Sequence, residues 1–337
     1  MYRHLLVPVD GTDLSTQTVG QAVEFARTLG ARVTFFHAVP DYASSLQGEA
    51  EVVWSTSPSD YVYAFEGKAR ELLAKAESAA RAQGVACSAV SAVSDKPYAA
   101  ILAAARDAGC DLIYMASHGR RSSVGMMLGS QTLKVLMQTE IPVLVAATSN
   151  PAAPARAIGI VRDEHRSMAA VLHAWMHLLA TARVQGTPPD RTLMRAIVRY
   201  IKDFPVALHH PKEEEYLFRK LRERSTAVHA ELDELQRQHE RDHQLVAELA
   251  ALVDDEGSDP ATLEEAVKRY ASFMWDHMGR EEGVILPAAQ RHLKNEDWAE
   301  IDAAFSSNND PRFGSDTDMQ YRRLFSRIVN VAAANGA

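Results

Sequence analysis

Residues 204–218 read FPVALHHPKEEEYLF, a stretch whose apolar residues follow the buried side of a helix. Two histidines, His209 and His210, and the carboxylate of Glu213 lie among those apolar residues. Burying a carboxylate without a partner is costly, so buried charged groups in proteins normally pair with each other or bind a metal. The stretch therefore favours a helix that contributes ligands to a metal site inside a helical core.

Length and composition indicate a two-domain protein of ordinary globular character. The chain has 337 residues, of which 47% are hydrophobic and 24% are charged. A formal charge of −8 and a pI of about 5.9 leave no bulk positive field for nucleic acid. Two cysteines, Cys87 and Cys110, are too few for a disulfide framework, which favours a reducing compartment.

Neither a membrane span nor a signal peptide is expected from the sequence. No apolar run approaches the ~20 residues that a helix needs to cross a bilayer. The N-terminal MYRHLLVPVDG has too short an apolar stretch for a signal peptide, and no small-residue cleavage site follows it. We therefore expect a cytoplasmic protein with no membrane partner.

Residues 1–147 alternate short apolar runs with helical patterns, which is typical of a parallel sheet covered by helices on both faces. Residues 40–64, rich in Ser, Asp and Tyr, are expected to form a long insertion. The fold class that we predict is α/β followed by all-α, beginning with a doubly wound, parallel, five-stranded sheet. The predicted strands are 4–10, 31–39, 85–93, 111–117 and 142–147, and the predicted helices are 14–29, 65–83, 97–108 and 128–139.

Strand signals stop near residue 150. Residues 148–156, within ATSNPAAPARA, have no hydrophobic period and are expected to be a linker. Four long helical patterns follow, with short connections, and predict an up-down four-helix bundle over residues 157–305. Residues 306–337 are expected to form a helical tail. The four helical patterns span approximately 156–183, 190–222, 225–253 and 260–292.

Each of the four predicted helices places imidazole or carboxylate groups on its apolar stripe. In three helices the groups come in pairs four residues apart, which puts both side chains on one face with Cβ atoms roughly 5–6 Å apart. Two such groups can reach one metal or two adjacent metals. The groups are His165 in the first helix, His209 and Glu213 in the second, His239 and His243 in the third, and His277 and Glu281 in the fourth.

Five histidines and two carboxylates are too many ligands for one tetrahedral zinc. They fit two metals that share the carboxylates, and nitrogen and oxygen ligands suit iron, although affinity alone favours copper or zinc. Two assignments stay open. Pro211 should distort its turn, so His210 could replace His209, and Glu282 is an alternative to Glu281, which lies on the stripe and is preferred.

Residues 156–305 resemble the hemerythrin, or HHE cation-binding, family. HHPKEEEYLF and HMGREEGVILP are two copies of its His-x-x-x-Glu-Glu pattern, while DEHRSM and HERDH resemble its first-helix and third-helix histidines. The resemblance implies two non-haem iron ions with an oxo or hydroxo bridge and an open position for oxygen, peroxide or nitric oxide. It also implies ligand roles: one iron is held by His239, His243 and His277, the other by His165 and His209, and both are bridged by Glu213 and Glu281.

A zinc hydrolase is a rival interpretation of HERDH, because the segment matches H-E-x-x-H with Glu240 as the base. The two central positions, Arg241 and Asp242, are charged, whereas that motif usually lies in an apolar helix. The hemerythrin interpretation also explains the other five candidate ligands, so we prefer it.

The first domain resembles the universal stress protein family. Ala116-Ser117-His118-Gly119, nine residues and then Gly129-Ser130 match the family's G-x-x-G-x(9)-G-[ST] motif except at Ala116. The resemblance implies an ATP or AMP site at the carboxyl edge of the sheet, where ligands bind in such folds, and a homodimer formed through the last strand. The implied nucleotide-binding residues are Asp10, Ala38, Ala116, His118, Gly119, Arg120, Gly129 and Ser130.

Together these patterns predict a stress-response regulator that couples a nucleotide module to a di-iron site sensing oxygen, peroxide, nitric oxide or iron. No acid–base pair or activated nucleophile stands out beyond the metal site, which favours a binding protein over an enzyme. Two alternatives are a di-iron enzyme that decomposes peroxide or reduces nitric oxide, and an interaction scaffold.

Overall fold

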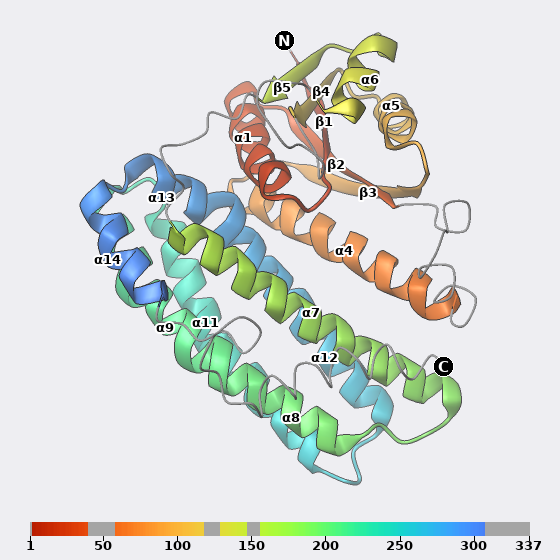
Figure 1. The fold of residues 1–337 in the computed structure, drawn as a ribbon, viewed down its shortest axis with the longest axis vertical. Coiled ribbons are helices and arrows are strands. Elements are labelled where there is room, and N and C mark those ends of the chain that lie inside the picture. Colours follow the sequence, from red (N-terminus) through yellow and green to blue (C-terminus); the bar gives the residue numbers. More distant parts are fainter. Residues whose placement is uncertain (1, 40–57, 118–128, 147–155, 307–337) are drawn as a thin grey trace. The chain divides into compact units, whose positions relative to one another are not determined.

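The computed structural model describes residues 2–39, 58–117, 129–146 and 156–306 (Figure 1). An α/β region comes first and a helical region follows, as predicted. Within the described ranges, no helix combines the length and the apolarity that a membrane span requires.

The α/β region contains a parallel five-stranded sheet in the order β3-β2-β1-β4-β5. Leu5, in the central strand, is in register with Val33 on one side and with Leu112 on the other. Strand order therefore reverses between β1 and β4, which is where such sheets bind ligands. All five predicted strands are confirmed: β1 His4–Pro8, β2 Arg32–Val39, β3 Cys87–Val93, β4 Leu112–Ala116 and β5 Val143–Ala146.

Two hydrophobic cores cover the two faces of the sheet. Adjacent residues of a strand point to opposite faces, so Leu5 joins one core while Leu6 joins the other. Helices α1 (Asp13–Leu29) and α4 (Pro58–Ala82) bury apolar residues in the first core. Helices α5 (Pro97–Asp107) and α6 (Ser130–Gln138) do so in the second. The sheet is therefore doubly wound.

The largest difference from the predicted helix boundaries is at the start of α4. Helix α4 begins at Pro58, seven residues before the expected start at Phe65. Proline suits the first turn of a helix because its missing N–H has no partner there in any case. Residues 58–64 therefore belong to α4 and not to the predicted insertion, although their composition is typical of a loop. The rest of that predicted insertion, residues 40–57, lies outside the described residues.

Among the described residues, the helical region contains the four long segments of the predicted bundle, followed by helix α14. Figure 1 shows these segments. The core of this region holds large apolar side chains from each segment, including Trp175, Ile197, Leu235 and Tyr270, all at most 1% exposed. The elements are α7 (Arg156–Gln185); α8 (Arg191–Ile201), η1 (Lys202–His209), α9 (His210–Lys212), η2 (Glu213–Phe218) and α10 (Arg219–Arg224); α11 (His229–Asp254); α12 (Pro260–Arg280), η3 (Glu281–Ile285) and α13 (Leu286–His292); and α14 (Asn295–Ser306).

Three π-helical segments, η1, η2 and η3, interrupt the α-helices at the positions of candidate ligands. In a π turn the backbone N–H bonds to the carbonyl five residues earlier, and such turns are frequent at functional sites. The N–H of His210 bonds to the carbonyl of Pro205 in this way. The predicted distortion near Pro211 is therefore present, and it takes the form of a wider turn.

Candidate metal centre

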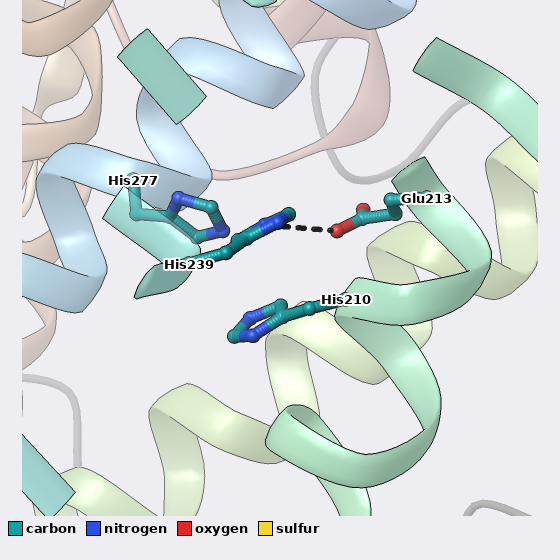
Figure 2. A group of neighbouring side chains, drawn as sticks. All are labelled: His210, Glu213, His239 and His277. Carbon is teal, nitrogen blue, oxygen red and sulfur yellow. Dashed lines mark ion pairs between the residues drawn. The ribbon is translucent and has the colours of Figure 1, made fainter. Parts of the chain in front are cut away.

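Two groups of buried nitrogen and oxygen donors lie in the core of the helical region. One group is His210, Glu213, His239 and His277, and the other is His165, His209, Glu213 and Glu281. Within each group the ligand atoms lie within 4.8 Å of one another. Figure 2 shows the first group, with its side chains converging from the second, third and fourth helical segments. Glu213 belongs to both groups, as a bridging carboxylate should.

Glu213 is fully buried and is surrounded by imidazoles. Its Oε1 lies 3.2 Å from Nε2 of His209, and its Oε2 lies 3.7 Å from Nε2 of His239. Neither oxygen makes a well-formed hydrogen bond within the described residues. In the fourth helical segment, Nε2 of His277 lies 3.5 Å from Oε1 of Glu281. The two carboxylates thus each contact an imidazole of the helix from which they come.

The electrostatics of the two groups are strongly coupled. Burial alone would raise the pKa of Glu213, but the facing imidazole of His209, together with His165 and His239, holds that pKa below its usual value. Burial alone would lower the pKa of His209, but the carboxylates of Glu213 and Glu164 hold it well above the usual value. The site therefore stabilises positive charge beside Glu213.

These donors fit two metal ions. Buried carboxylate oxygens without well-formed hydrogen bonds are costly unless a cation faces them. Imidazole nitrogen and carboxylate oxygen together suit a borderline divalent or trivalent metal such as iron. His210, His239 and His277 would hold one ion, and His165, His209 and Glu281 the other, with Glu213 common to both.

The π turns explain how consecutive histidines serve different groups. His209 ends η1 and His210 begins α9, and each contributes a ligand atom to its own group. The rings of His210 and His239 stack with centroids 4.2 Å apart and an interplanar angle of 14°. The sequence left His209 and His210 as alternatives, whereas the structure brings both to the centre.

The structure does not bring His243 to either group, contrary to the prediction. His243 is exposed, while Asp242, one residue earlier, is 1% exposed. The buried stripe of α11 advances from His239 by three residues to Asp242 and then by four to Val246, so His243 falls outside it. Glu240 is also exposed, so HERDH does not form the paired-histidine site of a zinc hydrolase.

Several other sequence-based assignments can be compared with this geometry. Of the two candidate carboxylates in η3, Glu281 belongs to a ligand group and Glu282 does not. Four further histidines of the helical region also lie outside both groups. They are His173, His177, His229 and His292.

Three carboxylates that the sequence reasoning did not assign lie directly behind the imidazoles. Nδ1 of His209 donates to Oε2 of Glu164 (2.7 Å), and Nδ1 of His239 donates to Oε1 of Glu214 (2.6 Å). Oδ2 of Asp242 lies 3.6 Å from Nδ1 of His210. Burial raises the pKa of Asp242 to about 6, although the hydroxyl of Tyr270 and nearby imidazoles lower it. A signal was present in the sequence, because each carboxylate is one or three residues from a ligand.

Helix α14 covers the His209 side of the centre. The ring of Phe305, which is fully buried, meets the imidazole of His209 edge-on at a centroid distance of 6.5 Å. Lys212 donates from Nζ to the carbonyl of Ala304 (3.1 Å). These contacts bring apolar and backbone groups to the edge of the site.

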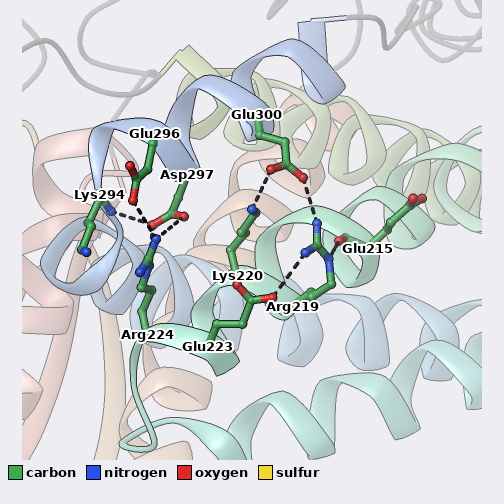
Figure 3. Close-up of polar contacts among 9 residues, drawn as sticks. All are labelled: Glu215, Arg219, Lys220, Glu223, Arg224, Lys294, Glu296, Asp297 and Glu300. Carbon is green, nitrogen blue, oxygen red and sulfur yellow. Dashed lines mark hydrogen bonds and ion pairs between the residues drawn. The ribbon is translucent and has the colours of Figure 1, made fainter.

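Ion pairs hold α14 against the end of the second helical segment (Figure 3). Arg224 donates to both carboxylate oxygens of Asp297, at 2.8 and 2.9 Å. The hydrogen bonds from that guanidinium lower the pKa of Asp297 to about 2, although burial by itself would raise it. Glu300 pairs with Arg219 at 2.8 Å and with Lys220 at 2.6 Å.

The candidate nucleotide-binding residues that the structure describes lie at the carboxyl edge of the sheet. Asp10 follows β1, Ala38 is near the end of β2, and Ala116 ends β4. Gly129 caps α6 and Ser130 begins it. The structure thus places these five residues at strand ends and at a helix start. His118, Gly119 and Arg120 lie outside the described residues.

Comparison with known proteins identifies the first region. Residues 1–147 match the universal stress protein family. A universal stress protein of Thermus aquaticus is 31% identical over 153 residues, which are 43% of this chain and 98% of that protein. The chain belongs to the universal stress protein family. A second member, YxiE of Bacillus subtilis, is 28% identical over 156 residues, which are 43% of this chain and 99% of that protein.

The chain also carries a second domain, because residues 156–289 match the hemerythrin HHE cation binding domain. Among solved structures, a universal stress protein from Burkholderia pseudomallei is 25% identical, covers 44% of this chain and 97% of its own, and has a TM-score of 0.35. One from Archaeoglobus fulgidus, in complex with dAMP, is 22% identical, covers 43% and 97%, and has a TM-score of 0.31.

Proposed function

We propose that the hemerythrin-type domain holds two non-haem iron ions and that the protein senses a small ligand, such as oxygen, peroxide or nitric oxide, at that centre. The observation that supports this proposal is the pair of donor groups sharing Glu213. Two overlapping sites with a common carboxylate suit two adjacent metal ions, whereas one tetrahedral ion needs four ligands.

In this proposal the ligand set is His165, His209, His210, His239, His277, Glu213 and Glu281. Bound iron would supply a centre for reversible ligand binding or for redox change. The protein's own residues would hold the metals and would exclude water from them, since each member of the set is at most 4% exposed.

We further propose that the α/β domain binds ATP or AMP at the carboxyl edge of its sheet. Support comes from the motif that ends at Gly129 and Ser130 and from the position of Asp10 and Ala116 where strand order reverses. A homodimer through β5 is part of the same proposal, because β5 is an edge strand. Light scattering of the purified protein tests the dimer.

Metal analysis combined with an ultraviolet-visible spectrum of anaerobically purified protein tests the metal proposal. We expect about two irons per chain and near-ultraviolet bands that appear on exposure to air. One tightly held zinc without iron, after growth in iron-replete medium, would contradict the proposal. Rapid turnover of peroxide or nitric oxide by the iron-loaded protein would instead favour the catalytic alternative.

A further inference from the structure

The three carboxylates behind the imidazoles share one arrangement. Glu164, Glu214 and Asp242 each face the Nδ1 atom of a candidate ligand, at 2.7, 2.6 and 3.6 Å. An imidazole that directs Nδ1–H at a carboxylate presents Nε2 on its other side. A hydrogen bond of this kind, as at His209 and His239, fixes both the ring orientation and the tautomer of a metal-bound histidine. The contact of Asp242 with His210 is longer than a hydrogen bond and acts through charge.

The arrangement also joins different helical segments. Glu164 on α7 supports His209 at the end of η1. Glu214 in η2 supports His239 on α11, and Asp242 on α11 faces His210 at the start of α9. The second and third segments therefore support each other's ligands. A shift of one segment would change the ligand orientation on its neighbour.

The same carboxylates carry negative charge close to the centre. Glu164 and Asp242 are 1% exposed, so water screens their charges poorly. The side chain of Glu214 is 35% exposed and is screened more strongly. A negative charge beside a redox metal stabilises its more positive oxidation state. The effect on the centre should therefore be larger for the two buried carboxylates than for Glu214.

We propose that Glu164, Glu214 and Asp242 are positioning residues that orient the ligand imidazoles and that stabilise the ferric over the ferrous state of the centre. This inference rests on the proposed function, since it requires iron at the two donor groups. It assigns part of the resistance of the centre to reduction to residues outside the ligand set.

The test compares Glu164→Gln, Glu214→Gln and Asp242→Asn with wild type, all as full-length iron-loaded protein. Each change removes charge but keeps an oxygen acceptor. Two controls are Glu215→Gln, an exposed neighbour, and Glu264→Gln, a 7% exposed carboxylate that pairs with Lys268 at 2.9 Å. Spectroelectrochemistry gives the reduction potential, and competition with a chelator gives the iron affinity.

We expect the reduction potential to rise in the three variants, more in Glu164→Gln and Asp242→Asn than in Glu214→Gln, and to stay unchanged in both controls. Glu164→Ala, which also removes the acceptor, should lower iron affinity by roughly 10–100-fold. Potentials equal to wild type in all three variants, with iron bound, would overturn this inference alone. Wild-type protein that binds no iron would overturn the proposed function and the inference with it.

Discussion

Replacing His210 by Ala separates the ligand set seen in the structure from the set predicted by the HERDH pattern. His210 is 4% exposed, so water has little access to take its place as a ligand. An outer hydrogen-bond partner already affects metal affinity by roughly 10–100-fold, and we take about 100-fold as the minimum loss for a ligand itself. That factor corresponds to about 2.7 kcal/mol of holoprotein stability.

For a helical region of about 150 residues, each kcal/mol changes the melting temperature by roughly 2–4 °C. His210→Ala should therefore reduce the gap between the holo and apo melting temperatures by roughly 5–11 °C and lower the iron content. Differential scanning calorimetry of iron-loaded and chelated protein measures the gap. His210→Ala also removes the ring stacking on His239, but this loss lowers the melting temperatures of the holo and apo forms alike and so cancels in the difference between them.

The matched control is His243→Ala, four residues from His239 but on the exposed side of α11. It should leave the iron content unchanged and the gap within a degree of wild type. The reverse pattern, with iron lost from His243→Ala and retained in His210→Ala, would refute the geometry of the centre and restore the ligand set predicted from the sequence.

Three further experiments test other parts of the protein. Gly129→Asp should abolish ATP binding in calorimetry without unfolding α6, because aspartate is a good N-cap but repels phosphate; equal affinity would contradict the phosphate site. Burial raises the pKa of Cys110 to about 11, so iodoacetamide followed by mass spectrometry should leave it unmodified at pH 8, with labelling faster as the pH rises. Because Arg224 holds the pKa of Asp297 to about 2, below the usual value near 3.9, that carboxylate stabilises the fold above pH ~4 and loses this effect as the pH falls toward 2. In Arg224→Ala, NMR titration should show the midpoint of Asp297 moving up toward that usual value.

Much of the fold could be predicted from the sequence because its signals are local. Buried parallel strands such as residues 4–8 and 32–39 are short and rich in apolar residues, and their alternation with helical patterns is typical of a parallel sheet covered on both faces. The start of α4 was missed because Pro58 and its polar neighbours resemble a loop as much as a first helical turn. Composition alone does not distinguish these two.

Six of the seven donors in the two groups could be predicted from the sequence. The seventh, His210, was expected only as an alternative to His209. Spacing arguments assume regular α-helix, but the π turn that ends at His209 changes the register at His210. The exclusion of His243 depends on how the buried stripe of α11 advances, by three residues rather than four after His239. The π turn at His209 and the exposure of His243 both depend on how the helical segments pack against each other. The residue pattern of one helix carries no information on that packing.

The position of helix α14 decides where a fragment containing the hemerythrin-type domain should end. The match to the hemerythrin HHE domain ends at residue 289, but Asp297, Ile301 and Phe305 lie beyond that boundary and are at most 1% exposed. A fragment cut at the family boundary would expose the surfaces that Ile301 and Phe305 cover, at about 2 kcal/mol for each side chain. It would also open the edge of His209 to solvent. A fragment designed to keep these contacts with the candidate metal centre should therefore extend at least to residue 306.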